Sequence, residues 1–361
     1  MNDANELISF IASMSGEGNL RVEENLGEGY VRLRVSEAER RQAKHDIQHV
    51  EDIVIEMLRN ARDAGADKVY LATTKEDGVR TLVFLDNGSG VPQDMQERIF
   101  DARVTSKLDS MKMDRWGVHG RGMALFSIKQ NTDEARVVAS DVDLGSVFKV
   151  SVATDRLGER ADQSSWPQAV KDEDGHYVCA RGPHNIIRAA CEFALEELRA
   201  CDVYLGSPSE IAATLHAQAS SRLDASRLLF IDDEAELPVV DRLGLASDAE
   251  DFIRICSGLG LEMSERTAHR ILAGQIKPVR GVTARLLRER DSSSHASAPV
   301  DLAKDRRGLR IAKDDMAQFS RAVERDFNDL ASRYYLNLCG DPKIRVSRDR
   351  ITVTFDLAKE E

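Results

Sequence analysis

Three polar residues, Glu56, Asn60 and Asp63, follow one another at intervals of four and three in residues 44–64. On an α-helix this spacing places the three side chains on one face. A carboxylate there can act as a general base, and an amide oxygen suits a hard cation such as Mg²⁺. The alternative is a polar face that is simply solvated. Asn60 favours the functional interpretation, because asparagine is a poor residue in a helix interior.

A carboxylate followed by two glycines comes directly after the predicted strand at residues 81–85. Asp86 can accept a hydrogen bond from an exocyclic amine, and Gly88 and Gly90 let the backbone approach a flat ring closely. The same residues are also typical of an ordinary turn. This motif alone therefore leaves binding and turn formation both open.

A second glycine loop runs directly into a predicted helix that starts at Met123. Its glycines are Gly117, Gly120 and Gly122. Backbone N–H groups at the start of a helix form a natural phosphate site. The spacing is neither that of a Walker A loop nor that of a Rossmann loop, and a flexible linker is the alternative. Hydroxyl and cationic groups that could contact a polyphosphate lie nearby, at Thr105, Lys107 and Arg121.

The elements that position these residues follow from hydrophobic periodicity. Residues 44–64 are expected to form one helix, whose apolar stripe consists of Ile47, Val50, Val54, Met57, Leu58 and Ala61. Two strands, 68–73 and 80–86, are predicted to form a hairpin across Glu76-Asp77-Gly78. Later strands are expected at 135–140 and 145–153. Helix, hairpin and glycine loops therefore follow in order within a short stretch of chain.

This ordered combination resembles the GHKL ATPase family, which includes gyrase B, cytosolic heat-shock chaperones, sensor histidine kinases and MutL proteins. The resemblance covers roughly residues 40–155. It implies an α+β fold, namely the Bergerat fold. That fold is a two-layer α/β sandwich with a mixed or antiparallel sheet, in which ATP lies between helices under a mobile lid. ATP and Mg²⁺ are accordingly the expected cofactors, and ATP hydrolysis is the expected activity.

The resemblance also implies a role for each motif residue. Glu56 would activate water, Asn60 would bind magnesium, and Asp86 would accept the adenine amine. Asp63 would assist on the purine side through water. The glycines divide between the adenine pocket (Gly88, Gly90) and the phosphate-binding lid (Gly117, Gly120, Gly122). Ser146 stands where many members have a threonine at the start of a late strand, and Thr105, Lys107 and Arg121 would bind nucleotide.

The continuation Asn-x-x-Asp-Ala-Gly-Ala after Glu56, together with Thr105-Ser106-Lys107, resembles the MutL and topoisomerase VI B branch. Members of that branch dimerise on binding ATP and hydrolyse it slowly, so an ATP-dependent homodimer is expected. Two alternatives stay open. One is a chaperone-like or signalling switch that never contacts DNA. A histidine-kinase-type phosphotransferase is less favoured, because only about 45 residues precede the helix that carries Glu56.

Charge and composition limit the class of protein further. The chain has 361 residues and a net charge of −12, which argues against a generally basic nucleic-acid coat. Residues 264–290 nevertheless carry seven lysines and arginines against two acids, and could contact DNA or a partner subunit. No apolar run reaches the roughly 18 residues of a membrane span. The N-terminus lacks the features of a secretory signal. The expectation is a cytoplasmic protein with no membrane partner.

Five cysteines without a C-x-x-C pair fit a reducing compartment and make a zinc site improbable. Composition shifts along the chain predict five regions. An ATP-binding domain covers 1–160, and a second α/β region covers 161–245. A helical segment at 246–290 faintly resembles a helix–two-turn–helix insert. A linker at 291–300 then leads to a C-terminal helix and β-hairpin at 301–361.

Overall fold

The computed structural model describes residues 22–106, 112–119, 122–160, 162–198, 200–223, 231, 233–287 and short stretches between 316 and 359. Three predicted site residues, Lys107, Gly120 and Arg121, lie outside the described residues, as does the predicted linker 291–300. The chain divides into two compact units, Met1–Ser292 and Ser293–Glu361. Among the helices of the described part, none is long and apolar enough to cross a membrane.

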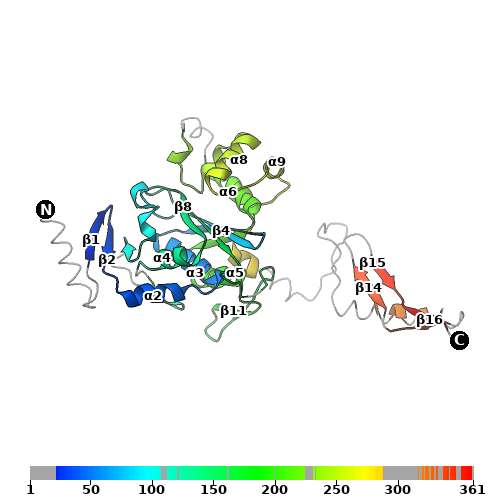
Figure 1. Ribbon diagram of the computed structural model, residues 1–361. Coiled ribbons are helices and arrows are strands. Elements are labelled where there is room, and N and C mark those ends of the chain that lie inside the picture. The colour runs from blue at the N-terminus through cyan, green and yellow to red at the C-terminus, as the bar shows by residue number, and fades with distance from the viewer. Residues whose placement is uncertain are drawn as a thin grey trace. The chain divides into compact units, whose positions relative to one another are not determined.

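A five-stranded sheet forms the centre of the first unit (Figure 1), with the strand order β12-β3-β4-β9-β8. Its strands are β3 (Lys68–Glu76), β4 (Val79–Asp86), β8 (Glu134–Ser140), β9 (Ser146–Ala153) and β12 (Asp202–Gly206). All neighbours are antiparallel except β12, which runs parallel to β3. The predicted hairpin is formed by β3 and β4. Its turn residues Asp77 and Gly78 both have positive φ, as a two-residue hairpin turn requires.

Helices cover the first face of this sheet. They are α3 (Val50–Asp63), α4 (Ala124–Asn131) and α5 (Ile186–Glu196). Side chains alternate along β3, so Val69 and Leu71 join the same core as Ile53, Leu58 and Phe193. The predicted α+β class, with a mixed sheet packed against helices, is confirmed.

The second face of the sheet is also covered (Figure 1). Tyr70 and Leu85 project there and pack against α6 (Pro208–Arg222), α8 (Ala249–Gly258) and α9 (Glu265–Leu272). Two short 3₁₀ segments, η3 (Glu234–Glu236) and η4 (Arg242–Leu245), lie between α6 and α8 in the chain. The helical segment that follows the predicted ATP-binding domain therefore adds a layer of helices to that domain's own sheet.

The helix predicted over residues 44–64 is in fact two helices, α2 (Glu37–Asp46) and α3. Ile47 has extended backbone angles, which end α2. The Asp52 carboxylate then accepts hydrogen bonds from the backbone N–H groups of Gln48 (3.0 Å) and His49 (2.9 Å). Such capping starts a new helix. Continuous periodicity concealed this break, but Glu56, Asn60 and Asp63 all remain on α3.

Smaller elements surround this core. A three-stranded sheet contains β1 (Val22–Gly27), β2 (Tyr30–Leu33) and β5 (Val104–Thr105). Two hairpins are β6 (Lys112–Asp114) with β7 (Gly117–His119), and β10 (Gln168–Lys171) with β11 (Tyr177–Arg181). Short 3₁₀ turns are η1 (Gln93–Met95) and η2 (Arg98–Phe100). In the second unit, β13 (Leu336–Leu338) pairs with β16 (Leu357–Lys359), and β14 (Lys343–Val346) pairs with β15 (Ile351–Thr354).

Candidate functional site

A cavity of about 500 Å³ lies among α3, the loop after β4, strand β5 and the start of α4. Most of the residues singled out in the sequence line it: Glu56, Asn60, Asp63, Asp86, Gly90, Thr105, Gly122 and Ser146. Gly88 adjoins it through a hydrogen bond to Asp86, and Gly117 begins β7. The fold therefore brings together residues that are up to 90 positions apart in the chain.

The polar stripe of α3 faces this cavity and is not a solvated surface. The five residues of the predicted apolar stripe that lie on α3 are all buried, which fixes the rotation of the helix. On the opposite side Glu56 is 22% exposed and Asp63 only 3% exposed at the side chain. Burying a charged group is costly unless it is paired, and carboxylates enclosed in a cavity are frequent at binding sites.

Asp86 ends β4 with its residue only 4% exposed, and its Oδ1 accepts a hydrogen bond from the N–H of Gly88 at 2.8 Å. Two positions of this loop must be glycine, because neighbouring backbone leaves no room for a side chain. A Cβ on Gly88 would lie 2.8 Å from the carbonyl oxygen of Ala64. Gly90 has a φ of +71°, and its Cβ would lie 1.7 Å from the Asp141 carbonyl oxygen. The loop is thus pressed between the end of α3 and the β8–β9 turn.

Ser146 lies beside Asp86, because the two are partners in the β4–β9 ladder. Its Oγ is 3.0 Å from the Oγ of Ser140. Ser140 in turn donates to the carbonyl oxygen of Gly145 (2.9 Å) and accepts from the N–H of Val91 (2.8 Å). These bonds hold the loop after β4 against the β8–β9 turn and give the cavity a rigid wall.

The first turn of α4 forms the opposite wall. Met123, Ala124, Leu125 and Ser127 line the cavity together with Gly122. Within the described part of the chain, no side chain caps the start of α4, whereas Ser36, Asn185 and Ser207 cap α2, α5 and α6. The N–H groups at the start of α4 are therefore suited to an anion, which the helix dipole also favours.

The cavity is chemically two-sided. Apolar side chains supply part of its lining: Met57, Phe84, Val91, Ile99, Trp116 and Phe148. Carboxylate and amide oxygens from Glu56, Asn60 and Asp86 supply another part. An apolar pocket with a few converging polar groups suits an organic ligand that carries a flat ring. Oxygen donors such as the Asn60 amide also fit a hard divalent cation.

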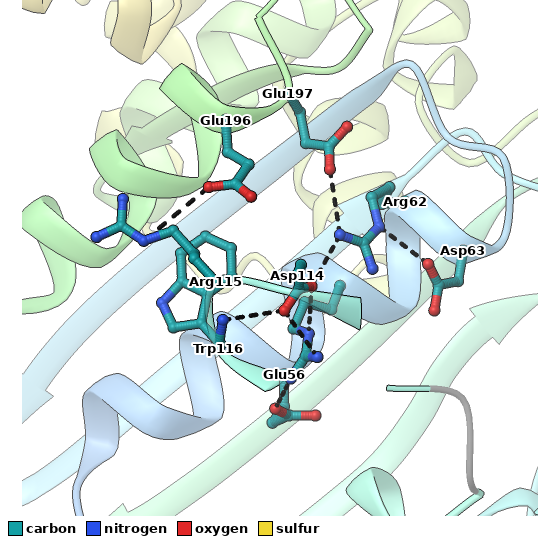
Figure 2. A network of polar contacts seen from close by, with 9 residues as sticks. Glu56, Arg62, Asp63, Asp114, Arg115, Trp116, Glu196 and Glu197 are labelled. Carbon is teal, nitrogen blue, oxygen red and sulfur yellow. Dashed lines mark hydrogen bonds and ion pairs between the residues drawn. The ribbon is translucent and has the colours of Figure 1, made fainter. Parts of the chain in front are cut away.

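One polar network at the cavity was not predicted from the sequence (Figure 2). Arg59 and Arg62 of α3 both donate to the Asp114 carboxylate at the end of β6. Arg59 also donates to Glu56, and Arg62 donates to Asp63. Burial alone would lower the pKa of Arg62, but its hydrogen bonds to Asp63, Asp114 and Glu197 hold that pKa above its ordinary value. The sequence signal was two arginines spaced by three on the helix that carries Glu56.

Comparison with known proteins adds an independent line of evidence. Residues 47–140 match the family model described as "Histidine kinase-, DNA gyrase B-, and HSP90-like ATPase". Two similar proteins, both called "DNA mismatch repair protein MutL", come from Staphylococcus aureus strains Newman and JH1. Each is 29% identical over 136 residues, which is 35% of this chain and 20% of the relative. The chain thus spans about a fifth of the length of the curated relatives it matches.

Proposed function

Residues 47–140 belong to the histidine kinase-, DNA gyrase B- and HSP90-like (GHKL) ATPase family, and on that premise we propose that the chain binds ATP with Mg²⁺ and hydrolyses it slowly. The observation that carries the proposal is the convergence of Glu56, Asn60 and Asp86 from two separate elements on one cavity of about 500 Å³. The MutL-like relatives support the same branch of the family.

The adenine would lie at the enclosed end of the cavity. Asp86 accepts the exocyclic amine there, and Asp63 contacts the purine through water. The apolar walls cover the faces of the ring. Gly88 and Gly90 allow the loop beside the ring to pack closely against the neighbouring backbone. Ser146 lies next to Asp86 and completes the polar edge.

The phosphates would lie at the first turn of α4, where backbone N–H groups are available. Gly122 lets this turn pass close to the β5 segment, since its Cβ would lie 2.7 Å from the Val104 carbonyl oxygen. The Thr105 hydroxyl adds a donor. Lys107, Gly117, Gly120 and Arg121 of the same segment are proposed to cover the phosphates.

Water attack on the γ-phosphate would be directed by Glu56, which orients the water and accepts its proton. Asn60, one turn further along α3, would hold Mg²⁺ through its amide oxygen. The cation, when bound, neutralises phosphate charge. The N–H groups of the α4 turn stabilise the charge that develops on the phosphoryl oxygens. We further propose that ATP binding closes a homodimer.

Replacement of the proposed base tests this function directly. Glu56→Ala is expected to retain ATP affinity and to lower kcat by roughly 100-fold or more, because general base catalysis contributes about that much. Since the variant keeps its ATP, light scattering should show it accumulating as a dimer with ATP, and the wild type should do the same with a non-hydrolysable analogue. Hydrolysis at the wild-type rate would exclude the mechanism. Glu37→Ala, an exposed site on α2, serves as the matched control.

A partner outside the ATPase site is suggested by the surface of α9 and the segment after it. Arg266, Arg270, Lys277 and Arg280 are exposed there, and none of them forms an ion pair within the described part of the chain. We propose DNA as the partner of this basic surface. The alternative is a switch that changes protein partners and never contacts DNA, which the whole-molecule test in the Discussion distinguishes. Transfer of radiolabelled phosphate to a histidine would instead indicate kinase chemistry.

A further inference from the structure

Arg59 has no part in the proposed chemistry, yet it is a charged side chain that the site almost completely encloses. Its side chain is 3% exposed, although it lies one turn after Glu56 on α3. A buried guanidinium is stable only where its N–H groups find partners. Its partners therefore indicate what the residue does.

Asp114, 55 positions further along the chain, holds Arg59 in a fork. Nε of Arg59 lies 3.0 Å from Oδ2 of Asp114, and Nη2 of Arg59 lies 3.0 Å from Oδ1. The Asp114 side chain is 8% exposed. Two parallel hydrogen bonds between planar groups fix the guanidinium plane as well as its position. The orientation of Arg59 is thus set by a residue of the β6–β7 hairpin.

The third nitrogen of the same guanidinium reaches the proposed base. Nη1 of Arg59 donates to Oε1 of Glu56 at 2.6 Å. A charge-assisted hydrogen bond of this length is strong and restricts the position of the carboxylate. The planar guanidinium of Arg59 therefore connects the hairpin to the side chain that would orient the attacking water.

The hairpin itself rests on a different element, α5. Arg115 extends toward Glu192 (3.5 Å) and Glu196 (4.0 Å), and the Trp116 ring stacks on Phe193. Trp116 also lines the cavity and donates its backbone N–H to Asp114 at 3.0 Å. A ligand that fills the cavity thus contacts the same hairpin that orients Arg59.

We infer that Arg59 is a positioning residue that makes the orientation of Glu56 depend on the seating of the β6–β7 hairpin through Asp114. When the hairpin is seated, the fork presents Glu56 to the reacting water. When the hairpin is displaced, Arg59 loses its two hydrogen bonds to Asp114, and the orientation of Glu56 is no longer fixed through the fork. This inference rests on the proposed function.

Asp114→Asn is the primary test, because it preserves shape but removes the charge and one acceptor from the fork. We expect kcat for ATP hydrolysis to fall roughly 10- to 100-fold, since small misplacement of a catalytic group costs that much. The KM and the affinity for a non-hydrolysable analogue should stay within about threefold, because the residues that hold the nucleotide are unchanged.

Further variants distinguish a positioning role from general damage to the fold. Arg59→Met should lower kcat to the same extent as Asp114→Asn. The double variant that combines them should have the same kcat as either single variant, because both substitutions break the same contact between Arg59 and Asp114. Arg59→Lys should fail to restore kcat, since an ammonium cannot form the fork. Glu197→Gln is the matched control. It removes the negative charge from a contact of Arg62 in the same network, leaves the contacts of Arg59 unchanged, and should keep the wild-type kcat.

Wild-type kcat in Asp114→Asn, or additive losses in the double variant, would overturn the inference. A wild-type protein that does not bind ATP would instead refute the proposed function, so the two failures are distinguishable. If Asp114→Asn does not fold, Asp114→Glu takes its place. That variant keeps the charge but displaces the carboxylate by one methylene, and unchanged kcat in it would equally contradict the inference.

Discussion

At the scale of single residues, the site depends on polar atoms that the fold encloses before any ligand arrives. Asp86 is the clearest case, because its carboxylate is buried at the end of β4 and bonded to the N–H of Gly88. That hydrogen bond fixes the position of one carboxylate oxygen and thereby the orientation of the whole carboxylate. A preorganised acceptor of this kind binds a ligand amine without first having to be ordered.

Asp86→Asn tests the proposed adenine contact. The amide can present an N–H group to the adenine amine, which opposes one donor to another. ATP affinity is expected to fall roughly 10- to 100-fold, equivalent to about 1.4 to 2.8 kcal/mol. The measurement is an equilibrium titration with a fluorescent ATP analogue. Asp143→Asn, an exposed position on the β8–β9 turn, is the control. Equal affinity in wild type and Asp86→Asn would contradict the assignment.

At the scale of elements, ion pairs between neighbouring strands and the segment after β9 support the sheet that carries Asp86. Glu159 accepts from Arg80 of β4 at 2.6 Å and from Lys75 of β3 at 3.0 Å. Burial alone would raise the pKa of Glu159, but these hydrogen bonds outweigh burial and lower it below its ordinary value of 4.5. The native state therefore favours the ionised carboxylate more strongly than the unfolded state does.

The pH dependence of this pair follows from the sign of the shift. Its contribution to stability is present above about pH 4.5 and is lost as pH falls through the lower pKa of the folded state. Glu159→Gln should reduce the free energy of unfolding by about 1 to 2 kcal/mol at pH 7, and the difference should narrow below pH 4.5. Urea denaturation of both proteins at several pH values measures this difference in the free energy of unfolding. A difference that does not change with pH would argue against the ion pairs as its source.

Glu134→Gln provides the comparison for that experiment. Glu134 pairs with Arg136 at the surface, where both side chains are more than 40% exposed. Exposed pairs contribute little to stability, so this variant should unfold almost as the wild type does.

At the scale of the whole molecule, the distribution of charge matters more than its sum. The net charge of −12 coexists with a basic surface on α9 and the following segment. Such a surface attracts phosphates locally, because salt screens the rest of the molecule beyond roughly 10 Å. The net charge therefore does not decide whether the partner is DNA.

Charge reversal of Arg266, Arg270 and Lys277 to glutamate tests the proposed DNA contact. Wild-type affinity for duplex DNA, measured by fluorescence anisotropy, should weaken steeply between about 50 and 200 mM salt. The triple variant should lose both the binding and the salt dependence while keeping its ATPase rate. Arg41→Glu, on exposed α2, is the control. A triple variant that binds DNA as the wild type does would favour the switch without DNA contact.

Much of the fold and of the cavity could be predicted from the sequence, because both depend on local patterns. Helical periodicity placed Glu56, Asn60 and Asp63 on one face, and strand alternation placed Asp86 at a strand end. The glycines at positions 88, 90 and 122 indicated where the backbone passes close to other segments, and a Cβ at each of them would collide with neighbouring backbone. The roles proposed for these residues remain predictions.

Three features were decided only by the tertiary structure. The break before α3 depends on how the Asp52 side chain bonds the backbone, which periodicity does not report. The cover of α6, α8 and α9 on the second face depends on the path of the chain after β12. The fork between Arg59 and Asp114 joins positions 55 apart. Local sequence encodes which face a side chain occupies, whereas its distant partner is set by how the elements pack.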